Sequence, residues 1–262
     1  MLFSNLPRVS YEKNQLVEVI CQLRFPTVLS IGVNEPVEFQ EAIRDEFPRY
    51  TVRNELVPAQ VAANGAAGSA PERKPVTNYH FISADGMWKL NVTNSFIALS
   101  TLNYENWEDF AQRFDQPLVS FLNLYRVALF DRLGLRYVNA ISRKALNLEG
   151  YAWKELIAGP HLGLMAGDEI SEADVVKAST ETELRLSDGC LLKLHTGPGL
   201  VNKMGQADSE VKFIFDCDVS MKGNITGDRI SGNLETLHKH ATELFRGAVS
   251  DTLHNALSPS AL

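Results

Sequence analysis

The chain has 262 residues, of which 45% are hydrophobic and 22% charged, and it carries a formal net charge of −7. A chain of this length and composition buries enough apolar surface to fold without disulfides or metals. The negative charge disfavours binding to nucleic acid and to anionic membrane surfaces. Three widely spaced cysteines without a CxxC pair, and an N-terminus without a signal-peptide pattern, predict a reduced, cytoplasmic location and no membrane association.

The N-terminal half begins with alternating apolar and polar residues over 17–25, which predict a half-buried strand. Its apolar positions are Val17, Val19, Cys21, Leu23 and Phe25. A short amphipathic helix is predicted next, with Pro36 in its first turn and its end before Pro48. Residues 58–77 are rich in Ala, Gly and Pro and predict a loop, either an inserted segment or a lid over a site.

Residues 78–104 have the pattern of a three-stranded β-meander, with a hairpin turn at Asp85-Gly86. Asn106 is then predicted to cap a helix with a long apolar stripe. Pro117 lies inside that stripe, and we expect it to kink or divide the helix. A further strand is predicted over residues 130–141.

The C-terminal half repeats this order of elements. A short helix is predicted over residues 151–158, followed by a hairpin that turns at Asp188-Gly189 and ends at Gly197-Pro198-Gly199. Strict alternation predicts a strand over 211–219. An apolar stripe then predicts one long helix over residues 233–256.

These elements predict an α+β fold in which helices pack on one face of a mainly antiparallel sheet. Their order favours two similar βββα halves. Residues 1–145 would hold the meander and the kinked helix, and residues 146–262 the hairpin, strand and long helix. We expect the two halves to form one compact unit.

The chain carries no dinucleotide-binding, P-loop, hydrolase, zincin or EF-hand motif. His238 and His240 each share a helix face with a glutamate, but a metal site would need two or more further ligands from elsewhere. Each cysteine lies in an apolar, strand-like stretch, where a thiol usually behaves as a small buried hydrophobe. The sequence therefore predicts no cofactor and no metal site.

Polar side chains on the predicted strands supply the candidate site. Alternation directs five of them away from the apolar stripes: Arg136, Lys193, His195, Asp216 and Asp218. The simplest interpretation is a sheet face that meets water. The functional hypothesis is a concave surface on which Arg136 and Asn139 hold an anion or polar ligand. Asp216 and Asp218 would bind a cation or orient the arginine.

Four segments resemble a known family. They are residues 16–26, 96–110, 132–139 and 237–254, and the most specific is the third, whose sequence follows an RxGLRYxN pattern. Together they are similar to a sporadically distributed, uncharacterised prokaryotic family of roughly this length. The resemblance implies a bacterial cytoplasmic protein, of the kind found as accessory factors in toxin–antitoxin or phage-defence systems. It implies no reaction and no functional residues.

Three functions are compatible with these patterns. The first is a non-catalytic binding or interaction module for a protein partner or a small ligand. The second is an enzyme that acts on a phosphorylated or nucleotide-like molecule, with Arg136 as an anion clamp and Asp216 or Asp218 in acid–base or metal roles. The third is a self-assembling subunit, which an exposed apolar stripe on the last helix would indicate. An enzyme should enclose the carboxylates and Arg136 in one pocket, whereas a module should leave them on an open face.

Overall fold

A computed structural model of the chain describes residues 2–56, 75–203 and 206–261. Its centre is one antiparallel sheet of nine strands, in the order β3-β4-β5-β6-β2-β7-β12-β9-β8. These strands are β2 (Leu16–Arg24), β3 (Arg49–Leu56), β4 (Pro75–Ile82), β5 (Trp88–Val92), β6 (Phe96–Thr101), β7 (Phe130–Ile141), β8 (Thr180–Arg185), β9 (Leu191–Gly199) and β12 (Lys212–Ile225). The predicted α+β fold is confirmed.

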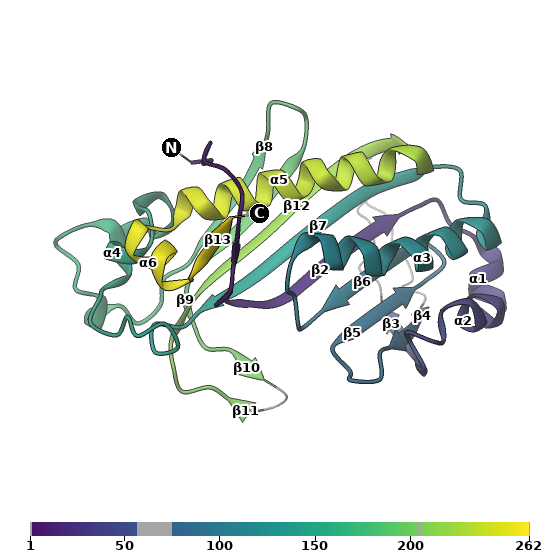
Figure 1. The fold of residues 1–262 in the computed structure, drawn as a ribbon, viewed down its shortest axis with the longest axis horizontal. Helices are drawn as coiled ribbons and strands as arrows, with labels where there is room; N and C mark the ends of the chain where they lie inside the picture. Colours follow the sequence, from purple (N-terminus) through teal and green to yellow (C-terminus); the bar gives the residue numbers. More distant parts are fainter. Residues whose placement is uncertain (1, 57–74, 204–205, 262) are drawn as a thin grey trace, which may run out of the picture.

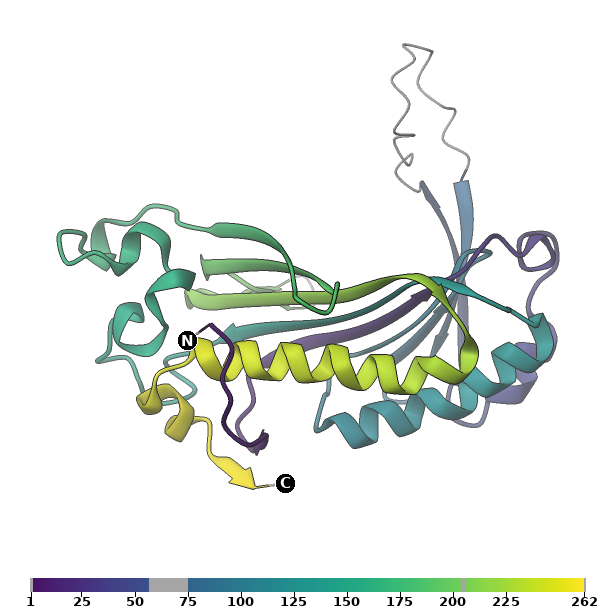
Figure 2. The ribbon, with the colours of Figure 1, turned by 90° about the horizontal axis from the view of Figure 1, so that it is seen from above.

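Helices are gathered on one face of this sheet, where α3 and α5 lie lengthwise (Figure 1, Figure 2). The α-helices are α1 (Leu29–Val33), α2 (Val37–Ile43), α3 (Trp107–Tyr125), α4 (Trp153–Leu156), α5 (Ile230–Ala248) and α6 (Asp251–Ala256). Four short 3-10 turns are η1 (Gly159–His161), η2 (Gly163–Ala166), η3 (Glu172–Asp174) and η4 (Gly227–Arg229). Within the described residues, no helix is long and apolar enough to cross a membrane.

The strand order is symmetrical about the centre of the sheet. On one side β2 pairs with β6, the last strand of a meander, and α3 follows that meander. On the other side β7 pairs with β12, the last of three consecutive antiparallel strands, and α5 follows them. Because β2 and β7 pair with each other, the two units share one sheet. Each unit thus consists of a leading strand, three further strands and a long helix, with β3 as an extra edge strand in the first.

The core lies between the sheet and the helices. The buried faces of β2 and β7 carry alternating residues such as Cys21, Leu23, Leu133 and Leu135, which are fully buried. They meet the apolar stripes of α3 and α5, in keeping with the two periodicities read from the sequence. The predicted apolar positions of α2, Phe39 among them, are buried in the same core.

Two smaller sheets complete the strands. β1 (Val9–Tyr11) pairs with β13 (Pro259–Ala261), and β10 (Asn202–Lys203) pairs with β11 (Gln206–Ala207). The first of these joins segments near the two ends of the chain, and Figure 1 shows the N-terminal segment that leads into β1 crossing over α5.

Several element boundaries differ from the prediction. The single helix expected over residues 233–256 is two helices, because Val249 is extended and forms a bridge with Ile157. Ser250 then caps α6 by accepting a hydrogen bond from Leu253 N at 3.3 Å. A backbone bridge and a new cap therefore override a continuous apolar stripe.

Pro117 does not divide its helix, since α3 is continuous around it. β9 continues through Gly199, beyond the point where the glycines were expected to end it. Strand β3 was not predicted at all. Of the expected loop over residues 58–77, the last three residues belong to β4, and residues 58–74 lie outside the described part of the chain.

Candidate functional site

The structure brings the five predicted polar side chains of the strands onto one sheet face. Asp218 lies directly between Arg136 of β7 and Lys193 of β9, and Asp216 lies opposite His195. Paired residues of neighbouring strands point to the same side, so these groups share the face opposite α3 and α5. The structure thus brings Arg136, Asp216 and Asp218 together with Lys193 and His195 on one surface.

Both aspartates on this face are held by arginines. Arg136 donates from Nε to Asp216 Oδ1 at 2.7 Å and from Nη2 to Oδ2 at 2.5 Å. Arg132 donates from Nη2 to both oxygens of Asp218 at 2.9 Å. The Arg136 contact joins two nitrogens to two oxygens and so fixes the planes of both groups, whereas Arg132 holds Asp218 through one nitrogen. The geometry therefore fits the orienting role considered for the aspartates, whereas any cation would have to compete with a guanidinium.

Gly134 makes the second ion pair possible. The Arg132 side chain runs along β7 directly over Gly134 to reach Asp218. A Cβ atom at position 134 would lie 2.2 Å from one guanidinium nitrogen and 2.6 Å from its central carbon. A side chain at position 134 would therefore displace the guanidinium end of Arg132 from this path. Arg132 was not predicted as a partner of the site, although its four-residue spacing from Arg136 places both side chains on one face of β7.

The edge strands continue this pattern of opposite charges. Lys193 Nζ is 2.5 Å from Glu183, and His195 Nδ1 is 3.5 Å from Glu181. The Arg136 side chain is 46% exposed. On this solvent-facing surface, each of these basic side chains lies next to an acidic one. The anion-binding role of Arg136 stays a prediction.

Asn139 does not join Arg136. Three positions along an uninterrupted strand reverse the side-chain direction, so Asn139 points to the helix-covered face. There it is 6% exposed and donates a long 3.4 Å hydrogen bond to Phe215 O. The structure therefore places Arg136 and Asn139 on opposite faces of the sheet and does not bring them together.

Asn139 instead lines a cavity of about 600 Å³ between the sheet and the helices. The floor is formed by β7 and β12, one wall by α5, and the other by the turn that leads into α3. The side chains with aromatic rings around it are Tyr11, Tyr104, Trp107, Tyr137, His238, Phe215 and Phe245. The cavity therefore lies where the two units of the fold meet.

The N-terminal segment forms the roof of this cavity. Residues 6–11 line it, and the segment is anchored on α5 by a hydrogen bond from Ser4 N to Glu243 O at 2.9 Å. Its far end is fixed by the β1–β13 ladder and by Tyr11, whose hydroxyl is 2.8 Å from His254 Nδ1. Both ribbon views show this segment crossing α5 (Figure 1, Figure 2).

His238 is the central polar group of the cavity wall. Its ring stacks on Trp107 with centroids 4.6 Å apart, and its Nδ1 shares a 2.8 Å hydrogen bond with the Tyr137 hydroxyl. Trp107 is held in turn by a 2.6 Å hydrogen bond to Glu235. Among the described residues, His238 Nε2 has no hydrogen-bond partner. That nitrogen is itself buried, so the surrounding protein atoms enclose it.

Burial keeps four ionisable groups of the cavity wall uncharged, although charged residues also line the cavity, namely Arg8, Glu105, Glu235, Lys239, Glu243 and Arg246. It lowers the pKa of His238 to about 3, to which the nearby Arg8 contributes, so the imidazole is neutral at physiological pH. Burial also raises the pKa of Tyr11 to about 12 and raises the pKa of Tyr137 and of the Cys217 thiol. Beside these charged side chains, the cavity thus offers flat aromatic surfaces and neutral hydrogen-bonding groups, and its cysteine and histidine supply neither a thiolate nor an imidazolium.

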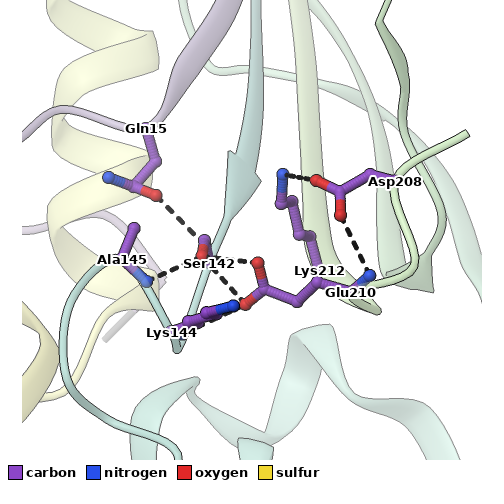
Figure 3. A network of polar contacts seen from close by, with 7 residues as sticks. All are labelled: Gln15, Ser142, Lys144, Ala145, Asp208, Glu210 and Lys212. Atoms are coloured by element: carbon purple, nitrogen blue, oxygen red, sulfur yellow. Dashed lines mark hydrogen bonds and ion pairs between the residues drawn. The ribbon is translucent and has the colours of Figure 1, made fainter. Parts of the chain in front are cut away.

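A second recess lies beside the first, at the end of β7 (Figure 3). The Glu210 carboxylate occupies it, accepting hydrogen bonds from Ser142 Oγ at 2.7 and 2.8 Å and from Lys144 N at 3.0 Å. Ser142 is fixed by Gln15, and Lys212 pairs with Asp208. The polar groups of this recess form hydrogen bonds and an ion pair with one another. These contacts connect the end of β7 to the start of β12.

Potential metal ligands meet at the β8–β9 turn. Asp188, Cys190 and His240 place one ligand atom each within 4.8 Å of the others. The sequence analysis had considered His240 only with residues of its own helix, because the pairing of a hairpin turn with a helix is not visible in local spacing.

No protein-family model matches the chain, and a search of curated proteins finds no similar sequence. The resemblance to the prokaryotic family therefore stays a prediction.

Proposed function

We propose that the protein is a non-catalytic binding protein that holds a small, flat, largely aromatic molecule in the cavity between α5 and the sheet. The observation that carries this proposal is the cavity itself. Its volume of about 600 Å³ lies within the range of roughly 300–1,000 Å³ typical of small-molecule sites.

The lining supports a flat ligand. Trp107, Tyr104 and Phe215 present rings from three different elements, and aromatic surfaces favour stacked or edge-on planar partners. Asn139, which lines the cavity, supplies a neutral hydrogen-bonding group, which fixes orientation without the desolvation cost of a charge.

Binding is favoured over catalysis by the position of the charged groups. Arg136, Asp216 and Asp218, which an enzyme would enclose, lie on the solvent-facing side of the sheet, away from the cavity. Inside the cavity, the raised pKa of the Cys217 thiol opposes a nucleophilic role.

The fluorescent probe N-phenylnaphthylamine, which is flat and uncharged, tests the proposal. We expect saturable binding to the wild-type protein. Thr242→Phe places a ring in the cavity from its α5 wall, and should weaken binding at least about tenfold, equivalent to 1.4 kcal/mol.

Ser231→Phe is the matched control, because it adds the same ring at an exposed position of the same helix. It should bind the probe as the wild type does. Equal affinities of the Thr242→Phe protein and the wild type, with both folded by circular dichroism, would place the probe elsewhere and contradict the proposal.

A further inference from the structure

A cluster of three different side chains lies where the β8–β9 hairpin touches α5. His240 Nε2 is 2.6 Å from Asp188 Oδ2, and Cys190 Sγ completes a group whose atoms all lie within 4.8 Å of one another. In a tetrahedral zinc site, the bond lengths place neighbouring ligand atoms about 3.3–3.6 Å apart. The observed separations, 2.6 Å for His240 Nε2 and Asp188 Oδ2 and at most 4.8 Å for the other pairs, lie on both sides of that range.

The local fold fixes the two hairpin residues of the cluster. Gly189 takes a positive φ of 87°, which closes the turn, and Asp188 Oδ1 accepts a 3.0 Å hydrogen bond from Cys190 N. Cys190 is fully buried and follows the inward-facing register of Leu192 and Leu194. Its sulfur is therefore directed to the side on which α5 lies.

α5 supplies the third member. The His240 side chain is 20% exposed and that of Asp188 37% exposed, so an ion can enter from solvent on their side. Phe3 of the N-terminal segment lies edge-on to the His240 imidazole, with ring centroids 6.1 Å apart. The cluster thus joins the β8–β9 turn to α5, two parts of the chain that are far apart in sequence, and the N-terminal segment packs beside it.

We propose that Asp188, Cys190 and His240 bind a zinc ion, with water as the fourth ligand. Thiolate, imidazole and carboxylate are the ligands that zinc takes in proteins, whereas calcium and magnesium take oxygen ligands. One thiolate and one carboxylate balance the charge of Zn²⁺, and binding releases the thiol proton to solvent. The ion ties the β8–β9 hairpin to α5.

The competing interpretation is a plain ion pair between Asp188 and His240, with Cys190 as a buried neighbour. The two differ in the role of sulfur, because an ion pair needs no thiolate. Cobalt distinguishes them, since Co²⁺ occupies zinc sites and a cobalt–thiolate bond gives a charge-transfer band in the near ultraviolet.

The test uses tag-free protein stripped of metal with a chelator, then dialysed against Zn²⁺ or Co²⁺. We expect about one zinc per chain by mass spectrometry of the metal and a thiolate band in the cobalt form. Cys190→Ala and His240→Gln should each weaken zinc binding by more than about 100-fold, because loss of a direct ligand costs at least as much as loss of an outer-shell partner.

Cys21→Ala is the control, because it also removes a fully buried thiol, and Cys21 is not a member of the Asp188–Cys190–His240 cluster. It should retain zinc and the cobalt band. Folded wild-type protein that takes up no zinc, or zinc binding that survives Cys190→Ala unchanged, would overturn the proposal.

Discussion

Side chains on β7 show how much depends on one residue of spacing. Arg136 and Asp216 were expected on one surface, and period-two alternation was sufficient to predict it. The same rule, applied strictly, assigns Asn139 to the other face, where it lines the cavity. Alternation does not reveal which side chains of neighbouring strands contact each other. The contact of Arg132 with Asp218, over Gly134, therefore becomes visible only with the strand register.

His238 provides a test at this scale through the pH dependence of stability. Burial lowers the pKa of His238 in the folded protein from 6.5 to about 3. Below pH 6.5 this histidine therefore binds a proton in the unfolded chain but not in the native protein. The contribution of the neutral His238 to the unfolding free energy is therefore fully present above pH 6.5 and is lost as the pH falls below that value. Between pH 7 and pH 5, His238→Gln should remove about 2 kcal/mol of the decline in unfolding free energy.

Urea unfolding at the two pH values measures this difference. Tyr137→Phe is the control, because it removes the hydroxyl that contacts His238 but retains the buried imidazole. It should keep the wild-type decline. Identical pH dependence in the wild type and in His238→Gln would show that this imidazole is not held neutral.

Among the elements, those with strong local patterns were predictable. β2, β7 and α3 follow alternation, periodicity and an N-cap that the sequence displays. β3 lacks a clean pattern, since its strand is set by pairing with β4, and β1 and β13 are strands only because they pair with each other. The break between α5 and α6 likewise depends on a bridge to Ile157, a contact of long sequence separation.

Asn106 tests the capping argument for α3. Its side chain accepts a 2.8 Å hydrogen bond from Asp109 N at the helix start, so Asn106→Ala should lower the unfolding free energy by about 1 kcal/mol. Asn103→Ala, at an exposed position just before the cap, should change it by less than about 0.5 kcal/mol. Denaturant titrations of both variants measure the two changes in unfolding free energy. Equal changes would contradict a stabilising role for the Asn106 cap.

At the scale of the molecule, the class of fold was predictable and the strand order was not. The order of elements suggested two similar halves, but only the pairing of β2 with β7 shows how they share one sheet. The apolar stripe of α5, including Leu237 and Leu244, is buried against that sheet, so it offers no sign of the self-assembling subunit considered from sequence. The cavity arises at the junction of the two units, which no local pattern indicates.

The central claim is that this junction holds a small molecule. The most direct measurement is mass spectrometry of the compounds released on denaturing protein purified from its own cells, for the wild type and for Thr242→Phe. We predict one flat, aromatic compound at close to one molecule per wild-type chain and its loss from Thr242→Phe. A wild-type protein that releases no such compound, or equal amounts from both proteins, would contradict the claim.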